Sequence, residues 1–339
     1  MKTAIFAYSR QGCRTALKAA KLFDADSVTL YAPQRFADKC FLSLENPSTE
    51  FYRRIFNDVQ VMIFVGSCGI AVRSIAPHLR TKLTDPAVIC VDELGHFAIS
   101  LLSGHIGGAN RIAARLAKIL GAQAVITTAT DINNRFSVDS WAARQGFAID
   151  NIKICKQISS QILETDVGFD SCLSVNGSLP KGLLPQKNGK IGILLSWYKE
   201  TPFETTLRII PPRLHLGIGC RKGVSCKNIS QAAEQVLKAN NIDFRAIKSV
   251  HSIDLKAEEE GLKQFCRQNN LSFECYSADQ LMQLKGHFSS SEFVKGITGA
   301  DNVCERAALM QADKLIVKKT AVDGVTVAVA ADMTEVYFE

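Results

Sequence analysis

Residues 60–77, QVMIFVGSCGIAVRSIAP, contain the pattern that organises the N-terminal half of the chain. The first six residues are almost wholly apolar, as expected of a strand that is buried on both faces. This run ends in the glycine turn Gly66-Ser67-Cys68-Gly69, and residues 70–77 follow as a short helix or turn. A buried strand that passes through a glycine turn into a helix is the repeating unit of layered α/β folds.

The same alternation of strand and helix extends to both sides of this stretch. In the N-terminal half, strands are predicted at residues 3–8, 27–32, 60–65, 87–91 and 123–128, with 96–100 as an antiparallel return. Helices are predicted there at residues 12–23, 47–57, 106–120 and 137–145. Beyond residue 212, strands are predicted at 214–218, 246–250, 272–276, 315–318 and 325–330, and helices at 225–239, 256–269 and 303–311. The fold class expected is α/β, with two layered α/β domains and mainly parallel sheets.

Between these two domains the chain changes character. Residues 168–212 are rich in Asn-Gly and Lys-Gly pairs and in proline, all of which favour turns. Short strands are predicted at residues 190–196 and 207–210. We therefore divide the chain into an N-terminal α/β domain at 1–145, a small, turn-rich middle domain or linker at 146–212, and a C-terminal α/β domain at 213–339.

Composition excludes several classes of protein. Hydrophobic residues make up 47% and charged residues 22% of the 339 residues, which is ordinary for a globular protein and excludes a disordered or fibrous chain. The formal net charge of +7 fits a polyanionic small molecule as readily as nucleic acid, and no block of five or six like charges favours nucleic acid. The longest stretch without a charged residue, 94–110, holds four glycines and is too polar to span a membrane.

The eleven cysteines indicate a reducing compartment. Their number is odd and no CxxC pair occurs, so neither a disulfide framework nor a zinc knuckle is predicted. The N-terminus has no apolar run long enough for a secretory signal. We therefore expect a cytoplasmic protein.

One segment combines several groups that can do chemistry. Asp92 and Glu93 follow the strand at 87–91, and Ser103-Gly104-His105-Ile106-Gly107-Gly108 precedes a strongly periodic helix. Ser103 is a candidate N-cap, the glycines allow a ligand to approach the backbone, and His105 can transfer a proton. If the two carboxylates face the imidazole across one sheet edge, this is a catalytic site. The alternative is a tight glycine turn with a structural histidine.

Two further strand ends carry polar groups. Gly66 and Gly69 are followed one turn later by Arg73, which either clamps a carboxylate or is a solvated helix residue. Thr127, Thr128 and Asp131 follow the strand at 123–128, where they can bind a polar ligand or cap the next helix.

In the C-terminal domain, Gly217-Ile218-Gly219-Cys220-Arg221-Lys222-Gly223 joins a strand to a helix. The spacing matches neither a P-loop nor the dinucleotide fingerprint, so an anion-binding turn is predicted instead. The histidines lack metal-ligand spacing, and no metal site is predicted.

Several long segments together resemble a known family. GSCGIAVRSIAPHL (66–79), DPAVICVDELGHFAISLLSGHIGGAN (85–110) and AVITTATD (124–131) resemble the N-terminal domain of cobalamin biosynthesis proteins of the cobalt-precorrin-5A hydrolase family. LGIGCRKGVS (216–225), TGADNVCERAAL (298–309) and VTVAVA (325–330) resemble the same family's C-terminal domain. The resemblance covers most of the chain and is weakest at residues 1–60 and 146–212.

The resemblance implies an enzyme of anaerobic corrin biosynthesis. Such an enzyme opens the δ-lactone of cobalt-precorrin-5A and releases acetaldehyde, giving cobalt-precorrin-5B. The substrate is a cobalt-bearing tetrapyrrole with many acetate and propionate carboxylates. No cofactor is needed, because cobalt arrives within the substrate and the macrocycle accepts electrons. Transient contact with methyltransferases of the corrin pathway is a further expected interaction.

On this basis, the residues singled out above receive roles. His105 is the expected general base, oriented by Asp92 or Glu93, with the N–H groups near Gly107 and Gly108 stabilising the oxyanion. The expected substrate-binding residues are Gly66, Gly69, Arg73, Ser103, Gly104, Gly107, Gly108, Asn110, Thr127, Thr128, Asp131, Gly217, Gly219, Arg221, Lys222 and Glu305. A cleft between the two domains would suit a flat macrocycle.

Two alternatives remain at this point. The chain could be a non-catalytic tetrapyrrole carrier or scaffold of the corrin pathway, since the C-terminal domain resembles a protein that also exists separately. Acetaldehyde release by the purified chain would distinguish the enzyme from the carrier. A nucleotide-dependent α/β enzyme is less well supported, because the glycine turns are irregular.

Overall fold

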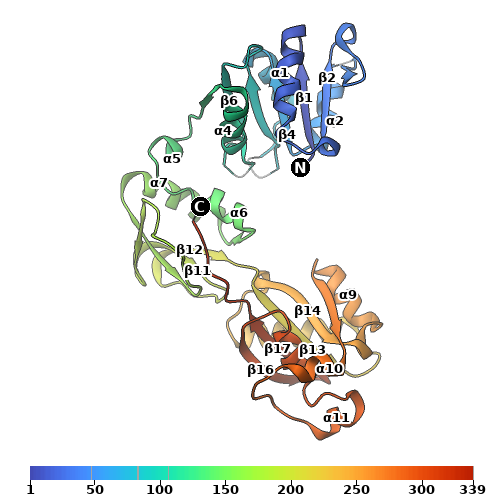
Figure 1. The fold of residues 1–339 in the computed structure, drawn as a ribbon. Coiled ribbons are helices and arrows are strands. Elements are labelled where there is room, and N and C mark those ends of the chain that lie inside the picture. The colour runs from blue at the N-terminus through green and yellow to red at the C-terminus, as the bar shows by residue number, and fades with distance from the viewer. Residues whose placement is uncertain (47, 82–83, 106, 339) are drawn as a thin grey trace. The chain divides into compact units, whose positions relative to one another are not determined.

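The computed structural model describes residues 1–46, 48–81, 84–105 and 107–338 (Figure 1). The chain forms two compact units, Met1–Ser140 and Trp141–Glu339. Among the described helices, none has the length and apolar character that crossing a membrane requires.

The first unit is built on one seven-stranded sheet with the order β3-β2-β1-β4-β5-β6-β7. Its strands are β1 (Thr3–Ala7), β2 (Val28–Ala32), β3 (Phe41–Ser43), β4 (Val61–Val65), β5 (Ala87–Val91), β6 (Phe97–Leu102) and β7 (Gln123–Val125). Strands β1 to β5 run parallel, β6 pairs antiparallel with β5, and β7 runs parallel to β6. The predicted antiparallel return is therefore confirmed, whereas β3 was missed because it is only three residues long.

Helices cover both faces of this sheet. One apolar core joins α1 (Arg10–Ala20) and α4 (Ala109–Leu120) to one face, and a second joins α2 (Ser48–Asp58) and α3 (Cys68–Ile75) to the other. This two-sided cover explains why β1, β4 and β5 are buried along their whole length. Pro47 and Ile106, the predicted first residues of two helices, lie outside the described residues.

The second unit contains two five-stranded sheets. The first has the order β10-β9-β11-β12-β8, with β8 antiparallel to β12 and the other pairs parallel. Its strands are β8 (Ala148–Ile149), β9 (Val167–Ser171), β10 (Leu183–Pro185), β11 (Gly189–Leu195) and β12 (Phe203–Ile210). Helix α7 (Ile152–Glu164) packs its apolar residues Cys155, Ile158 and Ile162 inward. The sequence analysis did not predict this helix, although the three residues have helical spacing.

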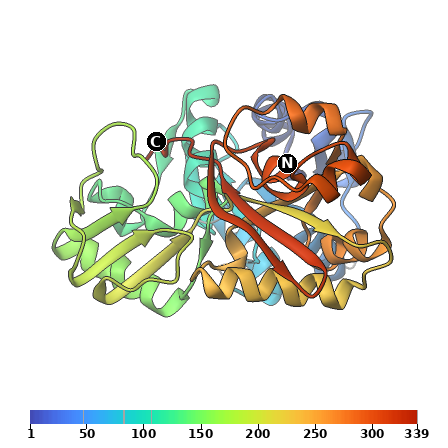
Figure 2. The same ribbon diagram turned by 90° about the horizontal axis from the view of Figure 1, so that it is seen from below.

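The other sheet of this unit has the order β15-β14-β13-β17-β16. Its strands are β13 (Leu214–Cys220), β14 (Ile247–Ile253), β15 (Ser272–Tyr276), β16 (Lys314–Val322) and β17 (Val325–Ala331), and the helices around it are α8 (Cys226–Ala239), α9 (Glu260–Gln268), α10 (Ala278–Gln283), α11 (Glu292–Thr298) and α12 (Val303–Leu309). β17 pairs antiparallel with both β13 and β16, and Figure 2 shows the β16–β17 hairpin in red. The three mixed, mostly parallel sheets confirm the α/β class.

The last described residues of the chain pack against the sheet of β8 to β12, which we call the middle sheet. Trp141 Nε1 donates a 2.8 Å hydrogen bond to the Tyr337 carbonyl, and the Trp141 ring stacks on Phe338. Val175 forms a β-bridge with Val336. Residues 146–212 therefore belong to the same compact unit as the C-terminal sheet, and whether they fold as a separate domain stays a prediction.

Gly217 was predicted to bind substrate, but the structure gives it a packing role in the interior. It is buried in β13, where α12 crosses the strand. A Cβ atom at this position would lie 1.7 Å from the Cys304 carbonyl oxygen and 2.8 Å from the Ala308 nitrogen. Only glycine allows the helix to approach so closely.

We predict that Gly217→Ala destabilises the second unit by about 3 kcal/mol or more, because both contacts are with backbone atoms that cannot rotate away. Urea unfolding followed by tryptophan fluorescence measures this, since both tryptophans, Trp141 and Trp197, lie in the second unit. The matched control is Gly296→Ala in α11, where an added Cβ meets no atom within 4 Å and should be neutral or stabilising. Equal unfolding midpoints for the two variants would contradict the packing role.

Candidate functional site

The predicted catalytic residues lie at opposite edges of the first sheet. Asp92 and Glu93 follow the C-terminal end of β5. Because β6 is antiparallel to β5, with Leu102 opposite Val88, the chain carries His105 back to the edge where β5 begins. At 3.3 Å per residue, β5 separates these edges by roughly 13 Å. Asp92 and Glu93 therefore do not orient His105, and that expectation is wrong.

Asp92 and Glu93 instead hold the turn and helix next to them. Asp92 accepts hydrogen bonds from the backbone N–H groups of Leu94 and Phe97, which close the β5–β6 turn. Glu93 accepts a 2.5 Å hydrogen bond from Ser9 Oγ, at the N-cap of α1. Both carboxylates thus have structural partners.

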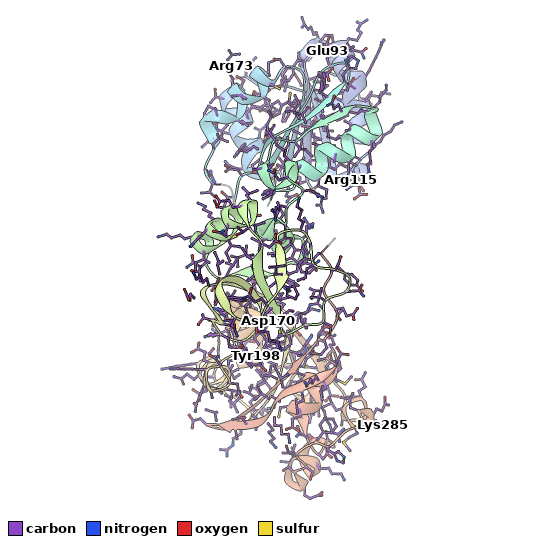
Figure 3. All side chains as sticks on the ribbon, turned by 90° about the vertical axis from the view of Figure 1, so that its left-hand side faces the viewer. Arg73, Glu93, Arg115, Asp170, Tyr198 and Lys285 are labelled. Carbon is purple, nitrogen blue, oxygen red and sulfur yellow. The ribbon has the colours of Figure 1, made fainter. Side chains whose placement is uncertain are left out.

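The edge of the sheet at which Glu93 lies, which we call the Glu93 edge, also contains three predicted binding residues of the next element. Gly66 lies just before α3, and Gly69 and Arg73 lie in its first and last turns. The Gly66 N–H donates to the Val91 carbonyl, and the exposed Arg73 has no carboxylate partner among the described residues. Figure 3 shows Arg73 and Glu93 towards the same end of this unit. These glycines and Arg73 stay predicted ligand-binding residues, separate from His105.

His105 is held in a tight loop between β6 and α4. The Gly108 N–H donates to the His105 carbonyl, and the N–H groups of Ala109 and Asn110 donate to the carbonyls of Ser103 and Gly104. An added Cβ at Gly107 would lie 2.5 Å from Ser103 Cβ, so the loop needs glycine there. The Gly108 amide is already bonded and is not free to stabilise an oxyanion, so that part of the prediction is wrong, whereas the role of the Gly107 amide stays a prediction.

Ser103 is not the N-cap of α4. Gly108 occupies that position in the left-handed conformation, with φ of 80° and no side-chain cap. The Ser103 hydroxyl instead donates to the Asp85 carbonyl at 3.0 Å, which ties the loop to the segment before β5. The prediction of Ser103 as the N-cap is wrong because the chain makes a further turn, closed by the hydrogen bond from Gly108 to His105, before α4 begins at Ala109.

His105 contacts two aspartates and a threonine, which together with Asn110 and Thr128 we call the His105 cluster. Nε2 lies 3.0 Å from both Asp131 Oδ2 and Thr130 Oγ1. Nδ1 lies 3.6 Å from Asp139 Oδ1. The imidazole is thus held between two carboxylates, at a partly exposed position.

The other members of the cluster fix Asp131. Asn110 Nδ2 donates 2.8 Å hydrogen bonds to both Thr128 Oγ1 and Asp131 Oδ2. Asn110 is 7% exposed, whereas the Asp131 side chain is 41% exposed. The buried amide therefore orients a carboxylate that stays accessible to water and ligand. Thr127 is exposed beside this cluster.

The two aspartates keep protons on the imidazole. The interaction with the Asp139 carboxylate is the largest cause that raises the pKa of His105, and it outweighs burial. Burial alone would raise the pKa of Asp139, but the interactions with His105 and the Ser137 hydroxyl outweigh it and lower that pKa. This arrangement favours the imidazolium form of His105 more than water does around an isolated imidazole.

Sequence analysis missed Asp139 and Thr130 as functional residues. Asp139 lies in the first turn of α6 (Val138–Gln145), where acidic residues are common as helix stabilisers. Thr130, in α5 (Ala129–Ile132), is adjacent to the predicted Asp131. The segment between β7 and α6 is rich in polar residues, and this was the available sequence signal. In the structure this segment returns to His105, which follows β6, and brings Thr130 and Asp139 into contact with it.

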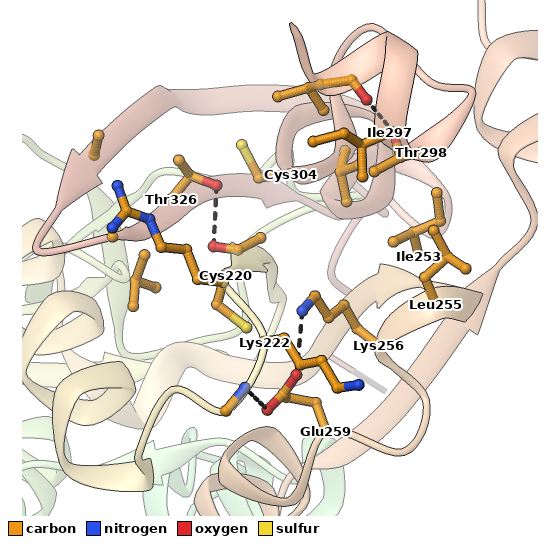
Figure 4. A pocket seen from close by; sticks show the side chains of 18 of the residues that line it. Cys220, Lys222, Ile253, Leu255, Lys256, Glu259, Ile297, Thr298, Cys304 and Thr326 are labelled. Carbon is orange, nitrogen blue, oxygen red and sulfur yellow. Dashed lines mark hydrogen bonds and ion pairs between the residues drawn. The ribbon is translucent and has the colours of Figure 1, made fainter.

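The second unit contains a large cavity, which we call the C-terminal cavity. It has a volume of about 1170 Å³, somewhat above the usual range for small-molecule sites (Figure 4). Its lining includes the predicted residues Gly219, Arg221 and Lys222, and an apolar part. The apolar part consists of Ile253, Leu255, Val294, Ile297, Val303 and Val325. Basic groups beside an apolar wall suit a flat, carboxylate-bearing ligand.

Glu305 was predicted to bind substrate, but the structure places its carboxylate in the interior, bonded to protein groups. It is 1% exposed, and its carboxylate accepts hydrogen bonds from the Ser289 N–H and hydroxyl, from Asn302 Nδ2 and from the Lys319 N–H. Every lone-pair direction available to a ligand is therefore occupied by the protein. Helix α12, which contains Glu305, forms part of the cavity wall through Val303 and Cys304.

A buried pair of histidines, His215 on β13 and His251 on β14, lies in the C-terminal sheet of the second unit. His215 Nδ1 lies 2.7 Å from Ser249 Oγ and 3.1 Å from His251 Nε2, and His251 Nδ1 lies 3.1 Å from Tyr276 Oη. Burial lowers the pKa of both imidazoles, that of His251 to about 3. Both rings are therefore neutral near pH 7. No group of three or more His, Cys, Asp or Glu side chains in the described ranges could hold a metal ion.

Comparison with known proteins gives consistent matches along the whole chain. The family model "Cobalamin synthesis G N-terminal" matches residues 50–131, and "Cobalamin synthesis G C-terminus" matches residues 214–330. A cobalt-precorrin-5A hydrolase from Salmonella typhimurium is 30% identical over 96% of each chain. One from Priestia megaterium is 27% identical over 96% of this chain and 94% of its own. A solved cobalamin biosynthesis protein G homologue from Sulfolobus solfataricus is 23% identical, with a TM-score of 0.43 over 97% of both chains.

We predict that Asp139→Asn lowers the pKa of His105, because the substitution removes the largest cause that raises it. An NMR titration of histidine ring resonances in the full-length chain measures this. Asp92→Asn is the control and should leave the His105 titration unchanged, since Asp92 lies at the other edge of the sheet. A shift of the His105 pKa in Asp92→Asn would contradict the described geometry.

We also predict that acid weakens the second unit through His251. Its folded pKa is below its unfolded value, so its contribution is complete above pH 6.5 and is lost as the pH falls towards 3. Between pH 8 and pH 5, about 2 kcal/mol of unfolding free energy is lost through this group. Urea unfolding followed by tryptophan fluorescence at both pH values should show this loss, and His251→Gln should reduce it. An equal loss in wild type and His251→Gln would disprove the assignment; exposed His96→Gln is the control.

Proposed function

The chain belongs to the cobalt-precorrin-5A hydrolase family, and from that premise we propose that it opens the δ-lactone of cobalt-precorrin-5A and releases acetaldehyde, giving cobalt-precorrin-5B. The observation that carries this proposal is the 30% identity to the Salmonella typhimurium cobalt-precorrin-5A hydrolase over 96% of both chains. The His105 cluster supplies the proton-transfer groups that a hydrolase needs.

Lactone opening requires one group to accept a proton and another to donate one. In this proposal, the accessible Asp131 carboxylate takes a proton from the attacking water, and the His105 imidazolium protonates the ring oxygen as the C–O bond breaks. Asp139 holds Nδ1 and keeps the imidazolium in place. Since Asp131 Oδ2 is 3.0 Å from Nε2, the proton on Asp131 can return to His105 and restore the starting state. His105 thus acts first as an acid, which revises its expected role as the base.

Carbon–carbon cleavage follows from the same groups. Before its proton is restored, the neutral imidazole can accept the proton of the hydroxyl that lactone opening frees. The electron pair of the broken C–C bond passes into the conjugated macrocycle, which takes up the proton from the His105 imidazolium, and acetaldehyde leaves. Asp131 then returns its proton to the neutral imidazole, which restores the starting state. We propose that no separate cofactor takes part, with cobalt arriving as part of the substrate.

The C-terminal cavity is the proposed binding site for the macrocycle. Arg221 and Lys222 contribute positive charge near its mouth, and its apolar wall can contact the flat ring. Transient contact with corrin-pathway methyltransferases and a cytoplasmic location complete the proposal. Free thiols at all eleven cysteines suit a reducing compartment.

We predict that His105→Gln lowers kcat for acetaldehyde release about 100- to 10,000-fold, because the proton donor is lost. Asp131→Asn should have a comparable effect, whereas Asp92→Asn should stay near wild type. Asp139→Asn should move the loss of activity at high pH to a lower pH, because it lowers the pKa of His105. A coupled alcohol dehydrogenase assay with cobalt-precorrin-5A measures the aldehyde, and circular dichroism verifies folding.

Near-normal turnover by folded His105→Gln would remove the imidazole from the mechanism. If the wild-type chain binds the macrocycle but releases no aldehyde, the carrier function replaces the proposed one.

A further inference from the structure

The acidic residues that line the C-terminal cavity are already neutralised by the protein. Each of the three glutamates has a cationic partner within the unit, in the pairs Glu258–Lys263, Glu259–Lys256 and Glu260–Arg267. Figure 4 shows the pair of Lys256 and Glu259. Three other lining cations, Arg221, Lys222 and Lys319, have no carboxylate partner among the residues described. The cavity therefore has a local excess of positive charge.

Lys319 comes from a different element than Arg221 and Lys222 and was not predicted to be functional. It lies in β16, where the pairing register with β17 shifts between Val317 and Thr320. Such a shift leaves backbone groups without their ladder partners and changes the direction of side chains. Lys319 is half-buried and lines the cavity, whereas Lys318 is exposed and does not.

Glu305 stabilises the backbone at this irregularity. Its Oε1 accepts a 2.7 Å hydrogen bond from the Lys319 N–H and a 2.9 Å hydrogen bond from the Ser289 hydroxyl. Burial would raise the pKa of Glu305, but the hydrogen bonds from Lys319 and Ser289 outweigh it and keep the carboxylate ionised. A buried, fully bonded carboxylate is a rigid anchor for the strand.

The charge of Lys319 acts inside the cavity. Cys304 also lines the cavity, and burial raises the pKa of its thiol to about 11, with Lys319 opposing the rise. The ammonium therefore lies close enough to this lining residue to affect it electrostatically.

We propose that Lys319 binds a peripheral carboxylate of the macrocycle and that Glu305 is the residue that positions it, through the irregular segment of β16. This inference rests on the proposed function for the identity of the ligand. It adds a cation to the two predicted from the glycine turn, and it gives Glu305 a positioning role in place of direct binding.

The test compares Lys319→Gln with the matched control Lys318→Gln in the full-length chain. Uroporphyrin, a flat macrocycle with acetate and propionate groups, is the binding probe, and its fluorescence gives Kd. We expect Lys319→Gln to raise Kd for uroporphyrin and KM for cobalt-precorrin-5A about tenfold, with kcat unchanged. Lys318→Gln should change either value less than twofold, since it removes the same charge from outside the cavity. Equal effects of the two substitutions would overturn the proposal.

A double-mutant cycle tests the role of Glu305. Glu305→Gln should raise Kd in the wild-type background but add little to Lys319→Gln, because it acts through that lysine. A merely structural role would give additive effects in the two backgrounds. If Glu305→Gln does not fold, the comparison of Lys319→Gln with Lys318→Gln still decides the lysine's role.

The two proposals fail in different ways. Absence of acetaldehyde with a raised Kd in Lys319→Gln refutes the proposed reaction and supports the lysine. Acetaldehyde release with unchanged KM and Kd in Lys319→Gln refutes the lysine and leaves the reaction. A wild-type chain that neither binds uroporphyrin nor releases acetaldehyde overturns the inference.

Discussion

In the first unit, the antiparallel pairing of β6 with β5 decides where each polar group lies. The five strands before it place their C-terminal ends, with Ser9, Gly66 and Glu93, at one edge of the sheet. The reversal takes His105 to the other edge, and the parallel pairing of β7 with β6 brings Asp131 to join it. Two polar regions result. The exposed His96 lies beside Asp92 in one of them, and the partly buried His105 lies between two carboxylates in the other.

Acidic side chains have different uses in the two regions. At the Glu93 edge, Asp92 accepts hydrogen bonds from the β5–β6 turn, and Glu93 accepts one from Ser9 at the start of α1. Both carboxylates therefore stabilise the local structure. In the His105 cluster, Asp131 and Asp139 flank a ring that can carry a proton. An imidazole between two carboxylates holds its proton more tightly, which favours acid catalysis followed by return of the proton.

In the second unit, the residues that hold the cavity wall in place differ from the cations that line the cavity. Gly217 lets α12 pack directly on β13, and Glu305, on the same helix, reaches the backbone of β16. The cavity wall is thus shaped by buried groups that a ligand never touches. Arg221, Lys222 and Lys319 line this cavity, and none of them has a carboxylate partner in the described part of the chain, so they are the proposed contacts for a carboxylate-rich ligand.

The sequence by itself determined the α/β class, most strands and helices, and the family, because these depend on local periodicity and on long motifs such as SGHIGGAN. It also located His105, Asp131, Arg221 and Lys222 near turns where ligands can bind. Only the tertiary structure decided which carboxylates face His105, because strand direction is a property of pairing between distant segments. The same holds for Glu305 and Gly217, since burial beneath α12 and hydrogen bonds to β16 connect residues that local patterns treat as independent.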